Sequence, residues 1–359
     1  MRRVEGYLPG TGIVRLESEG GTISSVAVVE PVEEWRPDLC DVGVVLPGMV
    51  DLQVNGYRTI DFGSEELSTD DVLAVARELW QVGVVGFCPT IITAPLARMA
   101  QSLRVLDDAR GQPVPEAPSV LGAHVEGPWI SPLDGARGAH PLDHVAAPDP
   151  AAAGRLLDAG SVAIVTVAPE LPGILDLITV LRDRGVLVSI GHSASAADLI
   201  APAVDRGAVL STHLGNGVPK DLRRHPNLIW EQLADDRLTG MFIADLHHLD
   251  PSTLAAMVRA KGETRIVLVS DTTMIAGMPP GRYETWIGGE VELSTAGRLT
   301  IVGTPYLAGA ALPLIAGLSN VLRLGIMSAR AAVSAVTRKP EAMLAGNGAA
   351  APPFRVGDP

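Results

Sequence analysis

The feature that most constrains the fold is a series of short apolar runs that recurs between residues 44 and 271. Most runs are separated by Ala-, Leu- and Arg-rich segments whose apolar residues recur with a helical period. There are eight runs: VVLPGMVDLQVN, VVGFCPTII, SVLGAHVEG, VAIVTVAPE, VLVSIGHS, AVLSTHLGN, LTGMFIAD and RIVLVSD. Near-continuous apolar strands that alternate with helices are typical of a parallel sheet covered by helices. Eight such units within roughly 230 residues favour a closed α/β barrel of the (β/α)8, or TIM, type over an open doubly wound sheet.

Three segments follow from this pattern. Residues 1–43 contain the β-prone stretches Gly12–Leu16 and Ile23–Val29 between glycine-rich turns, which predicts a small N-terminal β-sheet domain. Residues 44–346 are expected to form the barrel, and residues 347–359 an Ala/Pro/Gly-rich tail.

Composition narrows the class of protein. The formal net charge of -13 argues against general binding to nucleic acid or to anionic membranes. No apolar run approaches the roughly 18 residues of a transmembrane helix. The two cysteines, Cys40 and Cys88, form no CxxC pair and supply no disulfide framework, so a reducing compartment, the cytoplasm, is expected. A small anionic substrate is still compatible with this charge, because a few local Arg residues can hold one phosphate.

Polar residues capable of chemistry lie where several runs end. Glu126 ends the third run, His192 the fifth, His213 the sixth and Asp271 the eighth. The carboxyl ends of barrel strands meet on one face, where barrel enzymes place their active sites. One carboxylate and two imidazoles are a typical ligand set for catalytic zinc, although each histidine alone would be read as an ordinary loop residue. We therefore expect one divalent metal ion on Glu126, His192 and His213, with zinc ahead of iron, manganese or cobalt.

Three further residues could act beside this metal. Asp271 could take a proton from an activated water and pass it to a leaving amine, the alternative being a turn or helix-capping aspartate. His140 and His248 lie on loops that would overhang the same face and could donate hydrogen bonds to a substrate. His247, adjacent to His248, leaves that second assignment ambiguous, and a solvated loop histidine is the alternative for each.

Gln53 and Asn55, in DLQVNG, occupy a place where two histidines would complete a second metal site. Neutral amides are poor ligands for transition metals, so this pair indicates a single ion. The two amides are candidate substrate contacts, and hydrogen bonding to neighbouring backbone is the alternative.

A glycine-containing segment, LGNGVPKDLRRHPN, follows His213. It carries Asn216, Lys220, Arg223 and Arg224 together with glycines such as Gly217, and backbone N–H groups in such a turn can hold a phosphate together with Arg. A basic surface loop is the alternative.

Together these segments resemble the N-acetylglucosamine-6-phosphate deacetylases of the amidohydrolase superfamily. The matching segments, in the family's order, are PGMVDLQVNG, HVEGPWISP, GAHP, IGHSAS, THLGNGVP, IADLHHLD and LVSDTTMIAG. A weaker match continues through GTPYLAGAAL and TRKPEAMLAG. The resemblance implies a metal-dependent barrel that hydrolyses N-acetylglucosamine 6-phosphate to glucosamine 6-phosphate and acetate.

The resemblance also implies roles for single residues. Glu126, His192 and His213 would hold the metal, and Asp271 would be the general base and acid. His140 would contact the acetyl carbonyl and His248, rather than His247, the substrate. Asn216 and Gly217 would contact the phosphate, while Arg224 matches a phosphate-binding Arg shared across a homodimer interface. Gln53 and Asn55 match the single-metal members.

Departures from the family's pattern fall in the expected substrate pocket. LGNGVP stands where LYNAMP is usual, LHH where GLH is usual, and GTPYLAGAALPL replaces a Ser-containing loop. Another N-acyl substrate, such as N-acetylgalactosamine 6-phosphate or an unphosphorylated amino sugar, is therefore an alternative, as is a non-catalytic sugar-phosphate-binding barrel. Relatives continue for some tens of residues beyond RVGDP, so the small β-domain is expected to be incomplete.

Overall fold

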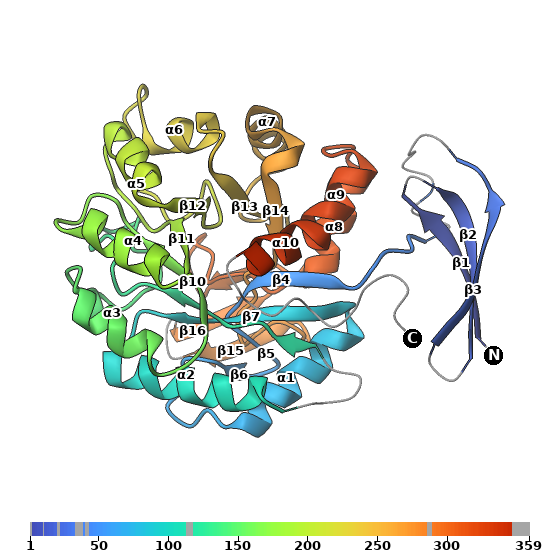
Figure 1. Cartoon of the computed structure of the whole chain (residues 1–359), viewed down its shortest axis with the longest axis horizontal. Helices are drawn as coiled ribbons and strands as arrows, with labels where there is room; N and C mark the ends of the chain where they lie inside the picture. Colours follow the sequence, from blue (N-terminus) through green and yellow to red (C-terminus); the bar gives the residue numbers. More distant parts are fainter. Residues whose placement is uncertain are drawn as a thin grey trace.

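Eight parallel strands dominate the computed structural model, which describes residues 2–9, 11–19, 22–32, 39, 43–112, 118–285 and 289–346. Cys40, most of the predicted boundary near residue 43 and the predicted tail lie outside the described residues. The strands are β4 (Met49–Val54), β7 (Val84–Ile92), β9 (Ala123–Glu126), β10 (Val162–Val167), β11 (Leu187–Ile190), β12 (Ala208–Ser211), β13 (Thr239–Ile243) and β14 (Ile266–Val269). Each pairs with the next in this order, and each lies within one of the eight predicted runs (Figure 1).

The last and first strands of the series meet and close the sheet. The backbone N–H of Asp271, just after β14, donates to the carbonyl of Gln53 in β4 at 2.9 Å. Asn55 N–H in turn donates to the carbonyl of Thr272 at 2.8 Å, and Val54 and Thr272 form a parallel bridge. The prediction of a (β/α)8 barrel is confirmed.

Helices cover the outside of the barrel (Figure 1). They are α1 (Thr69–Gln81), α2 (Leu96–Arg110), α3 (Pro150–Leu157), α4 (Ile174–Asp183), α5 (Ile200–Arg206), α6 (Leu228–Ala234), α7 (Pro251–Lys261), α8 (Leu314–Arg323), α9 (Ala329–Val336) and α10 (Arg338–Gly346). Short 3-10 turns, η2 (Leu142–His144), η3 (Ala197–Leu199) and η4 (Glu263–Arg265), join some of them to neighbouring segments. Among the described residues, none of the helices combines the length and apolarity that crossing a membrane requires.

Local sequence explains where these helices start and which face they bury. Helix α1 begins at a capping box in which Ser68 and Asp71 bond each other's backbone N–H groups. Helix α4 buries Ile174, Leu177 and Leu181, which recur at helical spacing. Each large aliphatic side chain fully buried in this way stabilises the fold by roughly 1.5–3 kcal/mol.

Small antiparallel sheets accompany the barrel. The N-terminal sheet consists of β1 (Arg2–Leu8), β2 (Gly12–Glu19) and β3 (Thr22–Glu30), and the first of these strands was not predicted. Tyr7 N–H donates to the Gly43 carbonyl at 2.8 Å, which attaches the sheet to the chain entering β4. Minor strands β5 (Gly56–Tyr57), β6 (Ile60–Asp61) and β8 (Ser119–Val120) lie near the first barrel strands.

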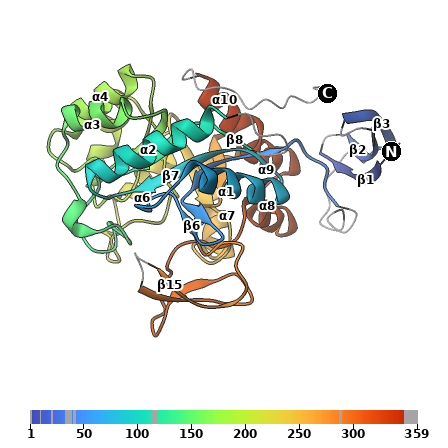
Figure 2. The same ribbon diagram turned by 90° about the horizontal axis from the view of Figure 1, so that it is seen from below.

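A second three-stranded sheet, called the inserted sheet below, follows the eighth barrel strand and was not predicted from the sequence. It consists of β15 (Gly281–Thr285), β16 (Gly289–Leu293) and β17 (Leu299–Ile301). Figure 2 shows it projecting from one end of the barrel. Ala308 N–H donates to the Leu299 carbonyl at 3.1 Å, and Ile301 N–H to that of Tyr306 at 3.0 Å, so the following loop folds back along β17. Residues of this sheet and loop line the cavity described below.

Candidate metal centre and active site

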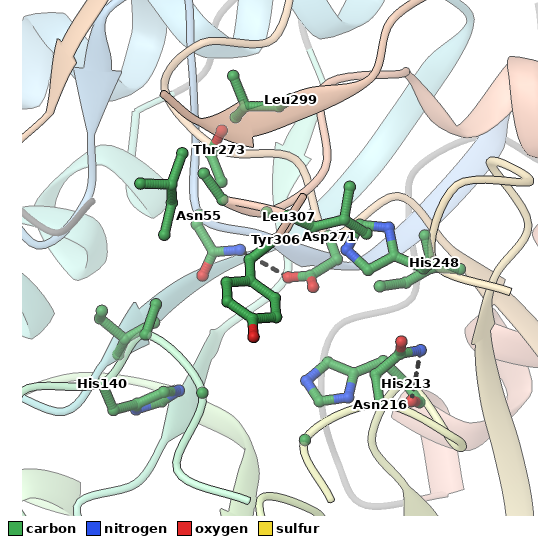
Figure 3. Close-up of a pocket in the computed structure, with 18 of the residues that line it drawn as sticks. Asn55, His140, His213, Asn216, His248, Asp271, Thr273, Leu299, Tyr306 and Leu307 are labelled. Carbon is green, nitrogen blue, oxygen red and sulfur yellow. Dashed lines mark hydrogen bonds between the residues drawn. The ribbon is translucent and has the colours of Figure 1, made fainter. Parts of the chain in front are cut away.

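A cavity of about 870 Å³ opens at the carboxyl ends of the barrel strands. The predicted site residues that line it are Asn55, Glu126, His140, His192, His213, Asn216, Gly217, His248 and Asp271. Figure 3 shows several of them around one space, contributed by segments far apart in the chain. The convergence expected from the strand ends is therefore present in the fold.

The predicted metal ligands are buried and lie together in this cavity. Glu126 Oε1 lies 3.1 Å from His192 Nε2 and 3.0 Å from His213 Nε2. Glu126 is 2% exposed, and one potential ligand atom from each residue lies within 4.8 Å of the others. One carboxylate and two imidazoles, buried and this close together, fit a divalent transition-metal ion.

Neighbouring groups fix the orientation of these ligands. His192 Nδ1 donates to the Ala136 carbonyl at 2.9 Å, which leaves its Nε2 lone pair directed at the cluster. Gln53 Nε2 donates to Glu126 Oε1 at 3.0 Å. Gln53 is fully buried and is not part of the cavity lining, and its side-chain amide contacts the Glu126 carboxylate.

The backbone at the ends of three strands has an uncommon conformation. His192, His213 and Asp271 all have positive φ angles, of 48°, 28° and 53°. Side chains other than glycine rarely adopt this region, and where they do, the surrounding structure must hold them there. The three residues follow β11, β12 and β14, so the turn that aims each side chain into the cavity is itself strained.

Electrostatics differ between the two buried carboxyl groups. Burial opposes ionisation of Glu126, but the adjacent imidazoles of His192 and His213 outweigh burial and hold its pKa well below the usual value. Burial, together with the nearby Glu126 carboxylate, raises the pKa of Asp271 to about 6. Two carboxyl groups whose pKa values are driven apart are suited to different tasks, one as a ligand and one as a proton carrier.

Asn55 is the group that positions the Asp271 carboxylate. Asn55 Nδ2 donates to Asp271 Oδ1 at 2.7 Å, a contact drawn in Figure 3. This bond favours the ionised form and lowers the pKa of Asp271 against the larger effect of burial. The sequence assigned Asn55 to substrate; the structure adds this contact within the protein.

Removing this bond is therefore expected to change the pH dependence of any reaction that needs ionised Asp271. In Asn55→Ala the pKa of Asp271 increases, so the acid side of the kcat/KM profile moves to higher pH. A hydrogen bond to a charged group contributes about 1.5–3 kcal/mol, so kcat is expected to fall by about tenfold or more. An unchanged profile and rate would contradict the positioning role.

His140 is held as a neutral hydrogen-bond donor. The backbone N–H of Thr93 donates to His140 Nδ1 at 3.3 Å, and the Thr93 hydroxyl lies 2.9 Å from the same atom. Burial and the adjacent His192 keep the pKa of His140 well below its usual value. With Nδ1 accepting from the backbone, the proton resides on Nε2, which is free to donate into the cavity.

Gly127 is required for this arrangement. It follows Glu126 with a φ of 90°, and a Cβ there would lie 2.2 Å from the Thr93 hydroxyl oxygen. A larger residue would displace Thr93 and with it His140. The role of Thr93 could not be predicted from the sequence, because it exists only through a contact with His140, which is distant in the chain.

A buried carboxylate distinguishes His248 from His247. Asp245 Oδ2 accepts from His248 Nδ1 at 2.8 Å, and Asp245 Oδ1 accepts both histidines' backbone N–H groups. His247 Nε2 instead lies 3.0 Å from the Ala296 carbonyl in the inserted sheet. The carboxylate thus aims the Nε2 of His248 toward the cavity, and Asp245 is a site residue that sequence reasoning missed.

The predicted phosphate-binding segment is only partly in the cavity. Asn216 Nδ2 donates to the His213 carbonyl at 3.1 Å, and a Cβ on Gly217 would lie 3.0 Å from His192 Nδ1. Lys220, in the same segment, lines the cavity. Arg224 is exposed and does not belong to the lining of its own chain's cavity.

Comparison with known proteins gives the family. No sequence-family model matches the chain. N-acetylglucosamine-6-phosphate deacetylase from Danio rerio is 34% identical over 288 residues, which cover 75% of this chain and 68% of that protein. The chain belongs to the N-acetylglucosamine-6-phosphate deacetylase family. N-acetylgalactosamine-6-phosphate deacetylase from Escherichia coli O157:H7 is 31% identical over 327 residues, covering 90% and 84% of the two chains.

Solved structures of the family have the same fold. An aspartate-to-alanine mutant of the Mycobacterium smegmatis deacetylase, in complex with N-acetyl-D-glucosamine-6-phosphate, superposes with a TM-score of 0.79 at 25% identity, covering 99% of this chain and 94% of that one. The deacetylase from Pasteurella multocida gives the same TM-score at 23% identity, covering 99% and 93%. The chain thus shares the barrel fold of these family members over nearly its whole length.

Proposed function

We propose that this protein hydrolyses the acetamido group of N-acetylglucosamine 6-phosphate, releasing acetate and glucosamine 6-phosphate. The observation that carries the proposal is the joint presence, in one cavity, of a Glu126–His192–His213 cluster, a buried Asp271 and a neutral His140. Membership of the deacetylase family supports the same reaction and makes a non-catalytic sugar-phosphate sensor the weaker hypothesis.

The residues divide the work of amide hydrolysis. A divalent ion on Glu126, His192 and His213 would supply Lewis acidity to water and to the amide carbonyl. Asp271 takes a proton from the attacking water and returns it to the departing nitrogen, and Asn55 holds the carboxylate that does so. The Nε2–H of His140 donates to the carbonyl oxygen as negative charge develops there. His248, aimed by Asp245, contacts the sugar.

We propose a single ion, with zinc as the preferred metal. The ligand set of one carboxylate and two imidazoles suits zinc, and iron, manganese or cobalt could be held by the same atoms. Gln53 and Asn55 stand where a second site would need stronger ligands, and each of these amides instead donates to an acidic residue of the site.

The galactosamine epimer is the second candidate substrate, because the Escherichia coli O157:H7 relative is named for it. A substrate panel distinguishes the two: acetate release is measured with N-acetylglucosamine 6-phosphate, N-acetylgalactosamine 6-phosphate and unphosphorylated N-acetylglucosamine. We expect the first to give the highest kcat/KM. A higher kcat/KM with N-acetylgalactosamine 6-phosphate would show that this sugar is the preferred substrate. Absence of acetate release from all three sugars would refute the proposed reaction.

We also propose a homodimer in which Arg224 contacts the phosphate bound by the partner. Arg224 is exposed and does not line its own cavity, so this role requires a second copy. Mixing inactive Asp271→Asn subunits with Arg224→Ala subunits then creates hybrid dimers with one complete site. Recovery of activity at low substrate concentration is expected after subunit exchange; a monomer by sedimentation, or no recovery, would contradict the proposal.

The site of action is proposed to be the cytoplasm, because the sequence contains two cysteines and no CxxC pair. Buried Cys88 is a free thiol in the structure.

A further inference from the structure

Two cations lie in the cavity wall that the family resemblance did not assign. Among the described lining residues, Lys220 and Arg298 are the only lysine or arginine side chains. Lys220 lies on the loop after β12, and Arg298 directly precedes β17 of the inserted sheet. Elements that are far apart in the chain therefore bring two permanent positive charges to one cavity.

Tyr306 brings these two cations to the same place. Lys220 Nζ donates to the Tyr306 hydroxyl at 2.7 Å and lies 4.3 Å from the centre of its ring. Arg298 Nη2 donates to the carbonyl of Pro305, the residue before Tyr306, at 3.1 Å. Both charged groups therefore contact the loop at Pro305 and Tyr306, and Figure 3 shows the Tyr306 side chain in the cavity.

Both cations retain hydrogen-bonding capacity. An ammonium group has three donors and a guanidinium group five, and the structure shows one side-chain donor of each in use. In the described part of the chain, neither side chain has an acidic partner within 4.0 Å. The nearby Asp134 carboxylate is instead bound by Arg137 at 2.6 Å.

Depth separates this cationic region from the reacting groups. Glu126 at the cluster is 2% exposed, whereas Tyr306 is 51% exposed and lies toward the mouth. In a 2-acetamido hexose 6-phosphate, the amide and the phosphate lie on different sides of the sugar ring. A substrate whose acetamido group reaches His140 and Asp271 would therefore direct its phosphate toward the mouth.

We propose that Lys220 and Arg298 bind the phosphate of the substrate, with Tyr306 as the residue that positions Lys220. The inference rests on the proposed deacetylation. It makes Lys220 and Arg298 the residues that give the enzyme its preference for phosphorylated sugars. A phosphate monoester has three terminal oxygens, so it can accept from these side chains and from a further cation at once. Because the chain's net charge is -13, local cations at the cavity would offset its repulsion of an anionic substrate.

Charge-removing variants test the proposal. Lys220→Met, Arg298→Met and the double variant are compared on N-acetylglucosamine 6-phosphate and on unphosphorylated N-acetylglucosamine. Each single change is expected to raise KM for the phosphorylated substrate by about tenfold while kcat stays within about twofold. Kinetics on the unphosphorylated sugar are expected to be unchanged, and Lys220→Arg is expected to retain most of the affinity.

Arg282→Met is the matched control, because this exposed arginine lies in the same inserted sheet near Glu290 and Glu292 and does not line the cavity. Calorimetric binding of glucosamine 6-phosphate gives a readout without turnover, and the double variant is expected to lose affinity for it but not for glucosamine. If wild-type protein deacetylates the phosphorylated substrate and the double variant has an unchanged KM, the inference is wrong while the proposed function stands. An equal loss of kcat on both sugars would also overturn it, whereas an inactive wild type would refute the proposed function itself.

Discussion

Asp271→Asn is expected to lower kcat by about 10²–10⁴-fold, the range that a well-placed general acid–base contributes. The substitution preserves the shape of the side chain. The amide oxygen of the substituted side chain can still accept from Asn55 Nδ2, which lies 2.7 Å from the carboxylate in the unchanged protein. What it removes is the ability to accept a proton from water and to return it to nitrogen. Because Asp271 serves both steps, we expect a loss in the upper part of this range.

Bound metal must be measured in the same Asp271→Asn sample, since a loss of metal would imitate a loss of the base. Elemental analysis is expected to give the wild-type value, because the predicted ligands are Glu126, His192 and His213. Asp236→Asn is a suitable control, as this exposed carboxylate pairs with Arg265 on the surface. Near-normal turnover of Asp271→Asn with its metal in place would contradict the mechanism.

Glu126→Gln is expected to have the second large effect, a loss of both bound metal and activity. A neutral amide is a poor ligand for a transition metal, and Glu126 also accepts from Gln53 and lies 3.1 and 3.0 Å from the Nε2 atoms of His192 and His213. Replacing residues that only support metal ligands typically costs 10–100-fold in affinity or activity, so loss of a ligand is expected to exceed about 100-fold. Metal content and acetate release, measured on the same preparation, test this.

The contrast with a surface glutamate makes the Glu126 result interpretable. Glu78 forms an ion pair with Arg58 at 2.8 Å on the outside of the barrel, and Glu78→Gln is expected to retain metal and activity. Thermal unfolding of Glu126→Gln shows whether the fold persists. A folded Glu126→Gln protein with full metal content would show that the ion is held elsewhere.

The sequence predicted the part of the site that strand ends determine. Glu126, His192, His213 and Asp271 each follow an apolar run, and barrel geometry alone requires such positions to converge. Asp245 ends the seventh run and Thr93 directly follows the second, but a strand-end position does not show that a residue acts through another side chain. Their roles appear only in the contacts with His248 and His140.

The inserted sheet was missed for a different reason. Its strands are short, few of their residues are buried, and it has no counterpart in the repeating barrel pattern. Lys220 was noticed in the sequence as one of several basic residues in a loop, but its pairing with Tyr306 joins positions 86 residues apart. The residues at the strand ends could therefore be predicted from the sequence, whereas the cation pair proposed to bind the phosphate required the fold.

Metal titration of depleted protein, with acetate release from N-acetylglucosamine 6-phosphate as the readout, tests the central claim most directly. If one ion on Glu126, His192 and His213 supports the reaction, activity should be negligible after chelation, increase linearly with added zinc and saturate at about one ion per chain. Acetate release that persists at the same rate without metal, or that saturates only at two ions per chain, would contradict a single-metal deacetylase.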